Sequence, residues 1–337
     1  MTERAERSKQ PIREDIAGRY AGKRIVVTGA SGYLASNLIQ ALRQIDCRIT
    51  RVSRRSELPK ENSCRAALDH ICGNVADAAL WLRLANDAEI IFHFAAQTSV
   101  PVAEQDPRGD WRVNVAPVQQ LLAACQAIGR APAVLLAGTV TQAGIADQLP
   151  VNEDLPDRPI TVYDRHKCAA EQLLEEHAKQ GHVGGTTLRL ANVYGPGPQS
   201  SSGDRGVLNL MIRRALGGEP LTIYGKGDWL RDYVFVDDVV DAFLRAGSSM
   251  DQVSGKHFVI GSGHGHTFTE AMGLVADRVT RRTGKRVEVR HVDPPQPLHP
   301  IEQRPFVADS SHFMKAASWQ AQVTLSDGID RTIEALS

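Results

Sequence analysis

Cysteine is scarce in this 337-residue chain, and neither sign of charge is in excess. The five cysteines are odd in number and show no C-x-x-C spacing. This pattern argues against a disulfide framework and predicts reduced, mostly packed thiols. Basic and acidic side chains number 39 each. A chain without a basic excess is not expected to bind nucleic acid or an anionic membrane surface.

Long apolar runs are also lacking. No stretch reaches the length of a transmembrane helix, and the N-terminus lacks the apolar core of a signal peptide. We therefore expect a cytoplasmic protein with no membrane partner. Residues 1–22 are polar and are expected to form a flexible tail. The 42% hydrophobic content of the whole chain is enough for a sizeable core.

The sequence shows no grouping of metal ligands. His264 and His266 flank Gly265 without a cysteine or carboxylate nearby, so a surface loop is their expected location. Asp237 and Asp238 are adjacent at a predicted strand-to-helix junction, where carboxylates commonly cap a helix and face its dipole. We predict no metal site.

A strand, a glycine turn and a helix stand near the start of the chain. Residues 24–27 form a strand pattern, residues 28–34 carry the glycines, and helical spacing of apolar residues continues to Leu42. Gly29 permits a tight turn, and Gly32 lets the backbone approach a pyrophosphate at the free N–H groups of the helix. The segment predicts a site for a dinucleotide coenzyme.

Two more apolar strands are predicted at residues 90–96 and 134–139. Strands that alternate with helical segments of this length form parallel sheets with helices on both faces, and ligands lie at the carboxyl ends of the strands. We therefore predict an α/β fold, a Rossmann-type doubly wound parallel sheet with a smaller C-terminal substrate domain. Thr139 stands at such a strand end and can hydrogen-bond a substrate oxygen.

Tyr163 and Lys167 are four residues apart in a predicted helix, so both side chains lie on one face. A fixed ammonium nearby favours the phenolate and lowers the pKa of the Tyr163 phenol. The pair can therefore give and take a proton during hydride chemistry. Thr139, Tyr163 and Lys167 are the candidate catalytic residues.

Together these motifs resemble the extended short-chain dehydrogenase/reductase family over about residues 23–330. They are Gly29-x-x-Gly32, His93-Phe-Ala-Ala, Asn114, Thr139, Tyr163 and Lys167. Two more specific segments look like the nucleotide-sugar epimerase, dehydratase and reductase branch. These are RLANVYGPG at residues 189–197 and YGKGDWLRDYVFVDDV at residues 224–239.

The resemblance implies which residues hold each ligand. Substrate contacts fall to Thr139, Asn192, Arg231 and Arg304, and a guanidinium suits a nucleotide-sugar diphosphate because it is a bidentate phosphate clamp. The implied coenzyme contacts are Gly29, Ser31, Gly32, Tyr33, Leu34, Ser53, Arg54, Arg55, Asn74, Val75, Phe94, Ala95, Ala96, Asn114, Tyr163, Lys167 and Leu190.

The motifs also divide the chain. The predicted NAD(P)-binding Rossmann domain spans residues 23–192, and residues 232–262 return to it. Residues 193–231 and 263–337 form the predicted substrate-binding domain. A homodimer through the helix that bears Tyr163 is common in the family and is expected here.

The residues after Thr139 narrow the reaction. The 4,6-dehydratases of this family carry an Asp-Glu pair directly after the threonine, since removal of water needs an acid and a base. Here Val140 and Thr141 follow, so dehydration is not expected. The glutamate of the related decarboxylases is missing too. Reduction of a keto sugar, or epimerisation through a transient keto sugar, remains.

The end of the second predicted strand bears on the coenzyme. Ser53 occupies the place where a ribose-binding acid is expected, and Arg54 and Arg55 beside it can hold a ribose 2′-phosphate. This pattern favours NADP(H) over NAD(H). An NADP site in turn favours net reduction, because epimerases of the family typically keep NAD bound.

Residues 137–142, 163–167 and 185–190 look like those of the 4-ketoreductases of deoxysugar biosynthesis. The resemblance implies NAD(P)H-dependent reduction of the 4-keto group of a nucleotide-activated, dTDP-linked 6-deoxyhexose. Two alternatives stay open. An NAD-dependent nucleotide-sugar 4-epimerase would use the same three residues without net coenzyme consumption. A non-enzymatic NADP-sensing regulator would keep the glycine turn, but such proteins commonly lose the tyrosine.

Overall fold

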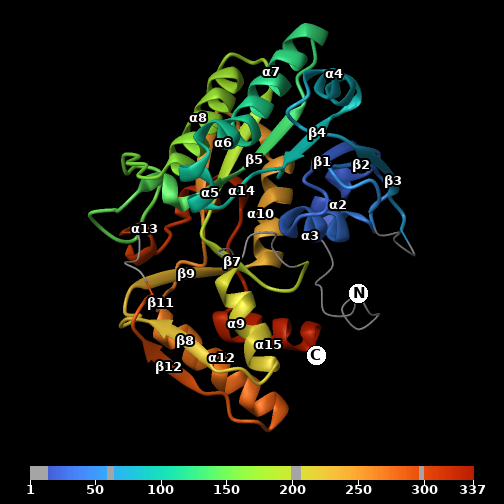
Figure 1. Cartoon of the computed structure of the whole chain (residues 1–337). Helices are drawn as coiled ribbons and strands as arrows, with labels where there is room; N and C mark the ends of the chain where they lie inside the picture. Colours follow the sequence, from blue (N-terminus) through green and yellow to red (C-terminus); the bar gives the residue numbers. More distant parts are fainter. Residues whose placement is uncertain (1–13, 59–63, 199–205, 296–299) are drawn as a thin grey trace.

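Seven parallel strands form the main sheet of the computed structural model, which describes residues 14–58, 64–198, 206–295 and 300–337. Their order across the sheet is β10, β6, β5, β4, β1, β2, β3 (Figure 1). All neighbouring pairs run parallel. The strands are β1 (Arg24–Thr28), β2 (Arg48–Ser53), β3 (Ala67–Cys72), β4 (Ile90–His93), β5 (Ala133–Thr139), β6 (Gly184–Leu190) and β10 (Lys256–Ile260).

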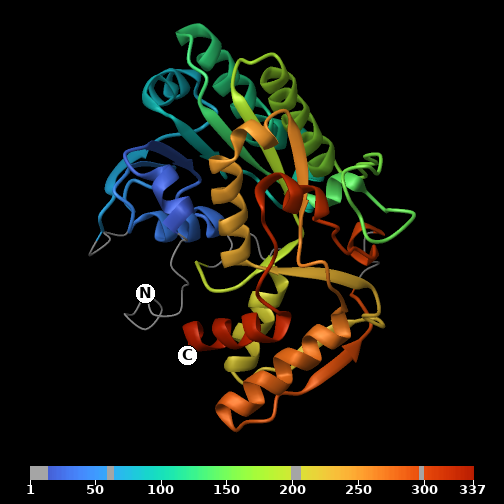
Figure 2. The same ribbon diagram turned by 180° about the vertical axis from the view of Figure 1, so that it is seen from behind.

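Helices cover both faces of this sheet, as Figures 1 and 2 show from opposite sides. One face carries α4 (Ala78–Asp87), α7 (Ala116–Ile128) and α8 (Val162–Lys179), and the other carries α3 (Tyr33–Leu42) and α10 (Val236–Ser248). Strands enclosed on both sides are apolar along their length instead of alternating. All four residues of β4 are buried for this reason. The predicted Rossmann-type fold is confirmed.

The strand order reverses at β1, which has β2 on one side and β4 on the other. In sheets of this kind a ligand crevice forms outside the carboxyl ends of the strands at the reversal. The turns after β1 and β4 meet there, since a Cβ added to Gly29 would stand 2.9 Å from the backbone nitrogen of Ala95. The glycine turn thus lies where the sequence predicts a coenzyme.

The N-terminal segment differs from the predicted flexible tail over residues 1–22. Helix α2 (Glu14–Tyr20) packs on the main domain, with the Tyr20 side chain fully buried. The Tyr20 hydroxyl donates a hydrogen bond of 2.7 Å to the carbonyl of Leu244 in α10. Ile16 and Tyr20, one turn apart, supply the buried face that the polar neighbours obscure in the sequence. The tail prediction is wrong for α2, and residues 1–13 lie outside the described residues.

The smaller domain lies below the main sheet in Figure 1 and has its own core around Ile223, Val275 and Ile329. A three-stranded sheet has the order β11, β9, β7, and a second sheet pairs β12 with β8. Its elements are β7 (Asn192–Tyr194), β8 (Leu221–Tyr224), β9 (Leu230–Phe235), β11 (Gly265–Thr267), β12 (Val289–Val292), α9 (Val207–Leu216), α12 (Phe268–Thr283) and α15 (Leu325–Leu336).

The chain crosses between the domains at other places than the sequence predicts. Residues 232–235 belong to β9 of the small sheet, so the return to the main domain begins with α10 and continues through β10. Helix α14 (Ser311–Ala317) falls in the predicted substrate domain, yet Phe313 and Trp319 are buried in the main core. Trp319 also donates from Nε1 to the carbonyl of Asp238 at 3.0 Å. Bulky aromatic side chains therefore tie this segment to the Rossmann domain.

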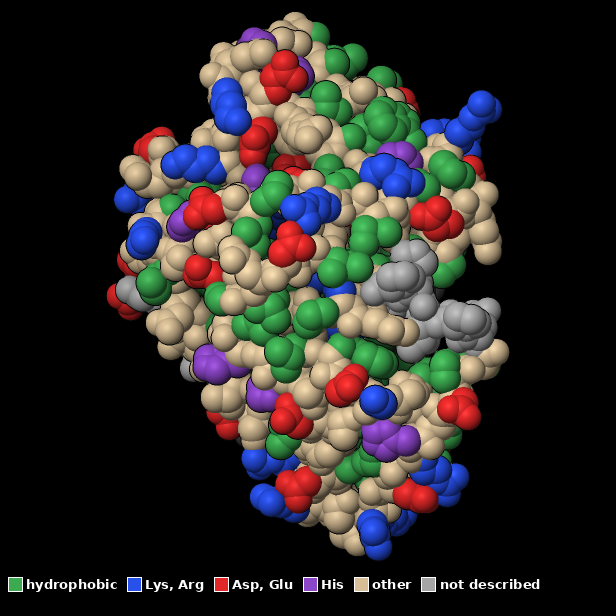
Figure 3. All heavy atoms as spheres, turned by 90° about the vertical axis from the view of Figure 1, so that its left-hand side faces the viewer, with side chains coloured by type: hydrophobic (Ala, Val, Ile, Leu, Met, Phe, Trp, Pro, Cys, Tyr) green, Lys and Arg blue, Asp and Glu red, His purple; other side chains and the backbone are tan. Residues whose placement is uncertain are grey.

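Short elements connect these parts: α5 (Val100–Gln105), α6 (Pro107–Asn114), the 3-10 helix η1 (Val140–Ala143), α11 (Met250–Val253) and α13 (Pro300–Gln303). Among the described residues, no helix has the length and apolar character needed to cross a bilayer. Acidic and basic side chains are interspersed on the face that Figure 3 shows.

Candidate active site

The turn between β1 and α3 forms a backbone site for an anion. Gly29 has a φ of +66°, in the left-handed region that glycine adopts readily. Gly32 is the N-cap of α3, and no side-chain cap covers the first N–H groups of the helix. The predicted contacts Ser31 and Leu34 lie in the same turn. Open N–H donors at a positive helix end fit the pyrophosphate of a dinucleotide.

Tyr33 begins α3, but its side chain points toward the loop after β7. The hydroxyl donates to the carbonyl of Gly195 at 2.9 Å, and burial raises the pKa of the phenol. A Cβ added to Gly197 would stand 2.8 Å from the Tyr33 ring. The side chain therefore joins the coenzyme turn to the loop after β7.

The predicted contacts Phe94, Ala95 and Ala96 follow β4 directly. The backbone N–H groups of Phe94 and Ala95 both donate to Oγ1 of Thr28 at 3.1 Å. Because Thr28 is the last residue of β1, these bonds hold the loop after β4 against the glycine turn. The loop is thereby fixed beside the crevice.

Ser53 is buried at the end of β2, where the sequence predicts a ribose contact. Its Oγ lies 3.2 Å from Nε2 of His70 on β3 and accepts from the backbone N–H of Arg55 at 3.3 Å. Arg54 and Arg55 are both exposed. Their guanidinium groups can therefore reach a phosphate at this strand end. The Ser53 hydroxyl is instead hydrogen-bonded within the protein.

Three other predicted coenzyme contacts lie at strand ends. Asn74 and Val75 follow β3, and Val75 accepts a hydrogen bond of 2.7 Å from Nε1 of Trp81. Leu190 ends β6 and pairs in register with Thr139. All three lie at the carboxyl edge of the sheet, as the sequence predicts.

Asn114 ends α6 and fastens the chain after β4. Its Nδ2 donates to the carbonyl of Gln97 at 2.9 Å and to Oδ1 of Asp110 at 3.0 Å. Its Oδ1 accepts from the N–H of Gln97 at 3.2 Å. Both amide hydrogens are thus occupied within the protein. Asn114 holds the loop that borders the predicted coenzyme position.

The three predicted catalytic residues are brought together. Thr139 ends β5, while Tyr163 and Lys167 lie in the first turns of α8 with 5% and 4% exposure. The Thr141 hydroxyl donates to Asp164, which joins the segment after Thr139 to the first turn of α8. The end of β5 and the first turns of α8, which carry the three residues, therefore adjoin at the carboxyl end of the sheet.

Burial lowers the pKa of Lys167 to about 8, and the negative charges of Glu171 and Asp110 oppose this shift. An amine with a pKa this close to neutrality can be charged or neutral near physiological pH. The protonation state of the Lys167 amine can therefore change when a nearby phenol such as Tyr163 ionises.

Three of the predicted substrate contacts, Asn192, Arg231 and Arg304, lie outside the main sheet. Arg231, on β9, donates to the backbone carbonyl of Arg304. The guanidinium of Arg304 lies 5.1 Å from the ring centre of Phe306. Asn192, on β7, pairs in register with Tyr233, two residues along β9 from Arg231. Arg231 is thus joined to Arg304 by a hydrogen bond, and Asn192 lies on the strand beside that of Arg231.

Two polar residues of α8, Asp164 and His166, make hydrogen bonds that the sequence analysis does not predict. Asp164 lies between Tyr163 and Lys167 and meets Thr141, while His166 lies 2.6 Å from the buried carboxylate of Asp110. The T-x-x-D spacing from residue 161 is a capping-box signal and could have placed Asp164 at the helix start. No local sequence pattern indicates that Thr141 and Asp110, which are distant in the sequence, are the partners of these two residues.

One group of potential metal ligands occurs among the described residues, namely Glu171, Glu175 and His257, whose ligand atoms lie within 4.8 Å of one another. Each already has a partner. Glu171 accepts from Arg189 at 3.0 Å, and Glu175 pairs with Lys179 and with His257, each at 3.0 Å. The group is occupied by cations of the protein itself.

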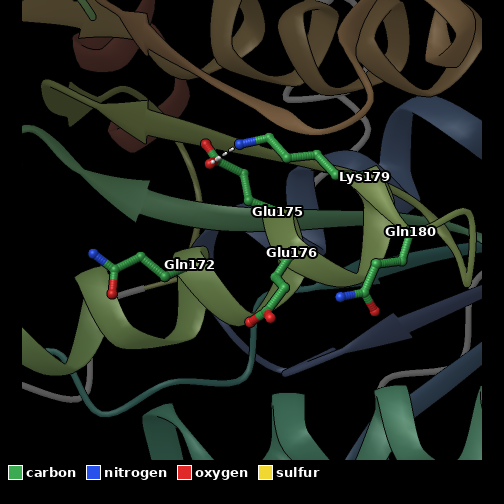
Figure 4. A pocket seen from close by; sticks show the side chains of 5 residues that line it. All are labelled: Gln172, Glu175, Glu176, Lys179 and Gln180. Atoms are coloured by element: carbon green, nitrogen blue, oxygen red, sulfur yellow. Dashed lines mark hydrogen bonds and ion pairs between the residues drawn. The ribbon is translucent and has the colours of Figure 1, made fainter.

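A surface hollow on α8 lies far from the predicted chemistry (Figure 4). It is lined by Gln172, Glu175, Glu176, Lys179 and Gln180. Glu175 follows Tyr163 by twelve residues, or about 18 Å along a helix axis. Its lining is charged and polar, and it contains none of the predicted site residues.

Comparisons with known proteins agree with this geometry. The chain is 32% identical to the UDP-glucose 4-epimerase of Mycolicibacterium smegmatis over 319 residues, which cover 92% of this chain and 97% of that protein. The structure matches the UDP-glucose 4-epimerase of Thermotoga maritima, solved with UDP-glucose, with a TM-score of 0.80 and 30% identity over 93% of this chain and 98% of that one.

A second solved structure, MoeE5 in complex with UDP-glucuronic acid and NAD, matches with a TM-score of 0.79 and 29% identity. The match covers 92% of this chain and 98% of that one. A profile of one protein family matches residues 25–261, which include the glycine turn, the three predicted catalytic residues and β10. The chain therefore belongs to the NAD dependent epimerase/dehydratase family.

Proposed function

We propose that the protein is a UDP-sugar 4-epimerase that interconverts the two configurations at carbon 4 of a UDP-hexose with bound NAD. One observation carries the proposal. The similarity to UDP-glucose 4-epimerases extends over both domains, 92% of this chain. The site adds support, because Val140 and Thr141 stand where a dehydratase needs carboxylates. The epimerase alternative from the sequence analysis is thus preferred to the 4-ketoreductase.

The chemistry of each side chain suggests its role in the proposed reaction. A bound NAD would supply the hydride acceptor and donor for carbon 4 of the sugar. Tyr163 takes the proton of the 4-hydroxyl and later gives it back, and the Lys167 ammonium favours the phenolate form that this requires. Arg231 and Arg304 hold the diphosphate of the nucleotide. The sugar can then turn while its nucleotide stays bound.

The coenzyme site would be built from the parts described above. The N–H groups at the start of α3 hold the pyrophosphate, and the fixed loop after β4 closes one side. Membership of an NAD-dependent enzyme family also counts against the non-enzymatic regulator.

Reduction of a keto sugar with NADPH is the second candidate, and one observation favours it. Arg54 and Arg55 are exposed at the end of β2, and no carboxylate occupies that strand end to hold a ribose hydroxyl. A dTDP-4-keto-6-deoxyhexose would be the substrate in that case. The two candidates differ in whether coenzyme is consumed.

The decisive experiment incubates the protein with UDP-glucose and follows UDP-galactose by proton NMR, without added reductant. We expect interconversion without net change in coenzyme. A parallel reaction contains NADPH and a dTDP-4-keto-6-deoxyhexose. Consumption of NADPH in step with product, and no conversion of UDP-glucose, would establish the reductase instead.

A tyrosine pair tests the assignment of the acid and base. Tyr163→Phe removes the phenol and should lower turnover by about a hundredfold or more, the usual contribution of a general acid or base. Tyr20→Phe is the matched control, because the Tyr20 hydroxyl bonds to the carbonyl of Leu244 in α10, away from the predicted site residues, and the variant should retain turnover. Near wild-type turnover in Tyr163→Phe would refute the proposed role.

A further inference from the structure

Thr139 begins a chain of hydrogen bonds that ends at a buried carboxylate. Its Oγ1 lies 3.0 Å from Oγ1 of Thr141, and the Thr141 hydroxyl donates to Oδ1 of Asp164. The Asp164 side chain has no solvent exposure. Its other oxygen, Oδ2, accepts from the backbone N–H of Thr161 at 3.2 Å. The proposed mechanism uses neither Thr141 nor Asp164.

The direction of every bond in this chain follows from counting hydrogens. A carboxylate accepts and cannot donate, so the single hydroxyl hydrogen of Thr141 belongs to Asp164. The contact between the two threonines then requires Thr139 to be the donor. Thr139 also accepts from the N–H of Thr141 at 3.3 Å. What Thr139 has left for a ligand is a lone pair, since its only hydrogen is held by Thr141.

We propose that Asp164 is a positioning residue that acts through Thr141 to fix Thr139 as a hydrogen-bond acceptor, so that the site prefers a sugar hydroxyl to a keto group at carbon 4. The inference rests on the proposed function, because it concerns the sugar oxygen that an epimerase oxidises. It names a selecting group outside the three catalytic residues. An acceptor at Thr139 also gives a physical reason why the site would bind a sugar nucleotide with a hydroxyl at carbon 4 more tightly than the keto intermediate.

The arrangement affects each stage of the reaction differently. The 4-hydroxyl first donates to the Thr139 lone pair, and rotation about the bond between carbon 4 and its oxygen then turns the proton to Tyr163. After the proton passes to the phenolate and the hydride to the coenzyme, the carbonyl oxygen can only accept. The Tyr163 phenol donates to it, but the Thr139 hydrogen remains with Thr141. The keto sugar is thus held by one hydrogen bond fewer.

Replacement of Asp164 by asparagine should reverse the chain. The Thr161 N–H is a donor, so the asparagine must turn its carbonyl oxygen toward Thr161 and its NH₂ group toward Thr141. Thr141 then accepts from the amide and donates to Thr139, whose hydrogen becomes available to the sugar oxygen. Thr141→Val frees the same hydrogen by a different route. Two chemically unlike substitutions are therefore expected to have the same effect on ligand preference.

The test compares UDP-glucose with UDP-4-deoxy-4-fluoroglucose, whose fluorine cannot donate, by calorimetry on the NAD-loaded protein. Wild type should bind the hydroxyl sugar more tightly than the fluoro sugar. In Asp164→Asn and in Thr141→Val this ratio should shrink about fivefold, which corresponds to one net hydrogen bond of about 1 kcal/mol. The double variant should show no larger change than either single variant, because both substitutions act on one chain.

A spectroscopic readout on the same proteins is independent of binding. With UDP-glucose at equilibrium, the fraction of coenzyme in reduced form, read from the near-ultraviolet absorbance of the dihydronicotinamide, should rise in both variants because Thr139 can now donate to the ketone. Asp77→Asn is the matched control. Asp77 caps α4 by accepting from the N–H of Ala79 at 3.0 Å, so the substitution removes a capping charge distant from Thr139.

The outcomes separate the two proposals. If the variants lose affinity equally for both sugars and the reduced fraction does not rise, Asp164 is only structural and the inference is overturned. If only Asp164→Asn unfolds, Thr141→Val still decides the question. If wild type neither binds nor converts UDP-glucose, the proposed function fails, and the selection at carbon 4 fails with it.

Discussion

The hydroxyl of Thr28 donates a hydrogen bond of 3.0 Å to Nδ1 of His93. The direction is fixed because Thr28 Oγ1 already accepts from the N–H groups of Phe94 and Ala95. His93 is therefore the tautomer with its proton on Nε2. That nitrogen is buried and has no hydrogen-bond partner among the described residues, and the ring centre of Trp81 lies 5.5 Å from that of His93. This pair joins β1 to β4 behind the coenzyme turn.

His93 should make the protein sensitive to acid. Burial, with the charge of Lys167 adding to it, lowers the pKa of His93 to about 3 from 6.5. Below about pH 6.5 the His93 imidazole is protonated in the unfolded chain but stays neutral in the folded chain. The free energy of unfolding therefore falls as the pH drops from 6.5 toward 3. This group alone accounts for a loss of up to about 5 kcal/mol.

The measurement is denaturant unfolding of wild type and His93→Gln across this pH range. Glutamine stays neutral and can accept from Thr28, so the variant should lose less stability on acidification. His264→Gln is the control, because His264 is exposed in a loop. Parallel pH profiles for wild type and His93→Gln would contradict the assignment.

The buried ammonium of Lys167 should lower the free energy of unfolding at neutral pH. Burial lowers its pKa from 10.5 to about 8, so the folded chain releases this proton before the unfolded chain does. Stability from this group therefore rises as pH increases from about 8 to about 10.5. Lys167→Met should abolish epimerisation and yet raise the stability of the nucleotide-free protein near pH 7 by up to about 3 kcal/mol.

The gain in Lys167→Met should shrink as the pH approaches 10.5, where lysine is neutral in both states. Lys179→Met on the same helix is the control, since the Lys179 side chain is 63% exposed and should show neither effect. A destabilised Lys167→Met protein would show that the buried amine contributes more through its contacts than it costs.

Gly29 and Gly129 separate two effects of a glycine. Both have a positive φ, but a Cβ on Gly29 would stand 2.9 Å from a backbone nitrogen, whereas nothing lies within 4 Å of one on Gly129. Gly129→Ala should cost about 1 kcal/mol of unfolding free energy for the left-handed backbone alone. Gly29→Ala should cost more and weaken coenzyme binding by about tenfold or more, as measured by calorimetry with NAD. Equal effects would mean that the contact with the loop after β4 relaxes freely.

Arg189 joins the middle of α8 to the loop that precedes this helix. It is 3% exposed, donates to Asp157 at 2.5 Å and 2.7 Å, and pairs with Glu171 of α8. Arg189→Leu leaves two carboxylates without their cation and should cost about 3–5 kcal/mol of unfolding free energy. The control is the exposed pair of Arg158 and Asp147 at 2.7 Å, where Arg158→Leu should cost about 1 kcal/mol or less. Denaturant titration of both variants gives the comparison.

Much of the active site could be predicted because its signals are local. The glycine turn, the strand ends and the four-residue spacing of Tyr163 and Lys167 each lie within one short segment. Chain order then places those segments at one edge of a parallel sheet. Thr139 was found in the same way, from its position directly after an apolar strand.

The missed features depend on contacts between distant segments. Asp164 resembles any helix-capping residue until Thr141 is brought against it, and Phe313 gives no sign in the sequence that it packs against β10. The hydrogen bonds of the Ser53 side chain within the protein could not be predicted for a different reason. Strands covered on both faces lack the alternation that would tell which residues point to solvent. The pattern therefore located the strand end but not the direction of the side chain.

The repeated passage of the chain between the two domains has a consequence for dissection of the protein. A fragment that stops at Leu190 contains the whole glycine turn and the catalytic helix, yet it lacks β10, which covers the outer edge of β6. The exposed row of N–H and C=O groups along β6 would then be available to strands of other molecules. Such a coenzyme-binding fragment should associate or precipitate, so the N-terminal half is not expected to behave as a self-sufficient unit.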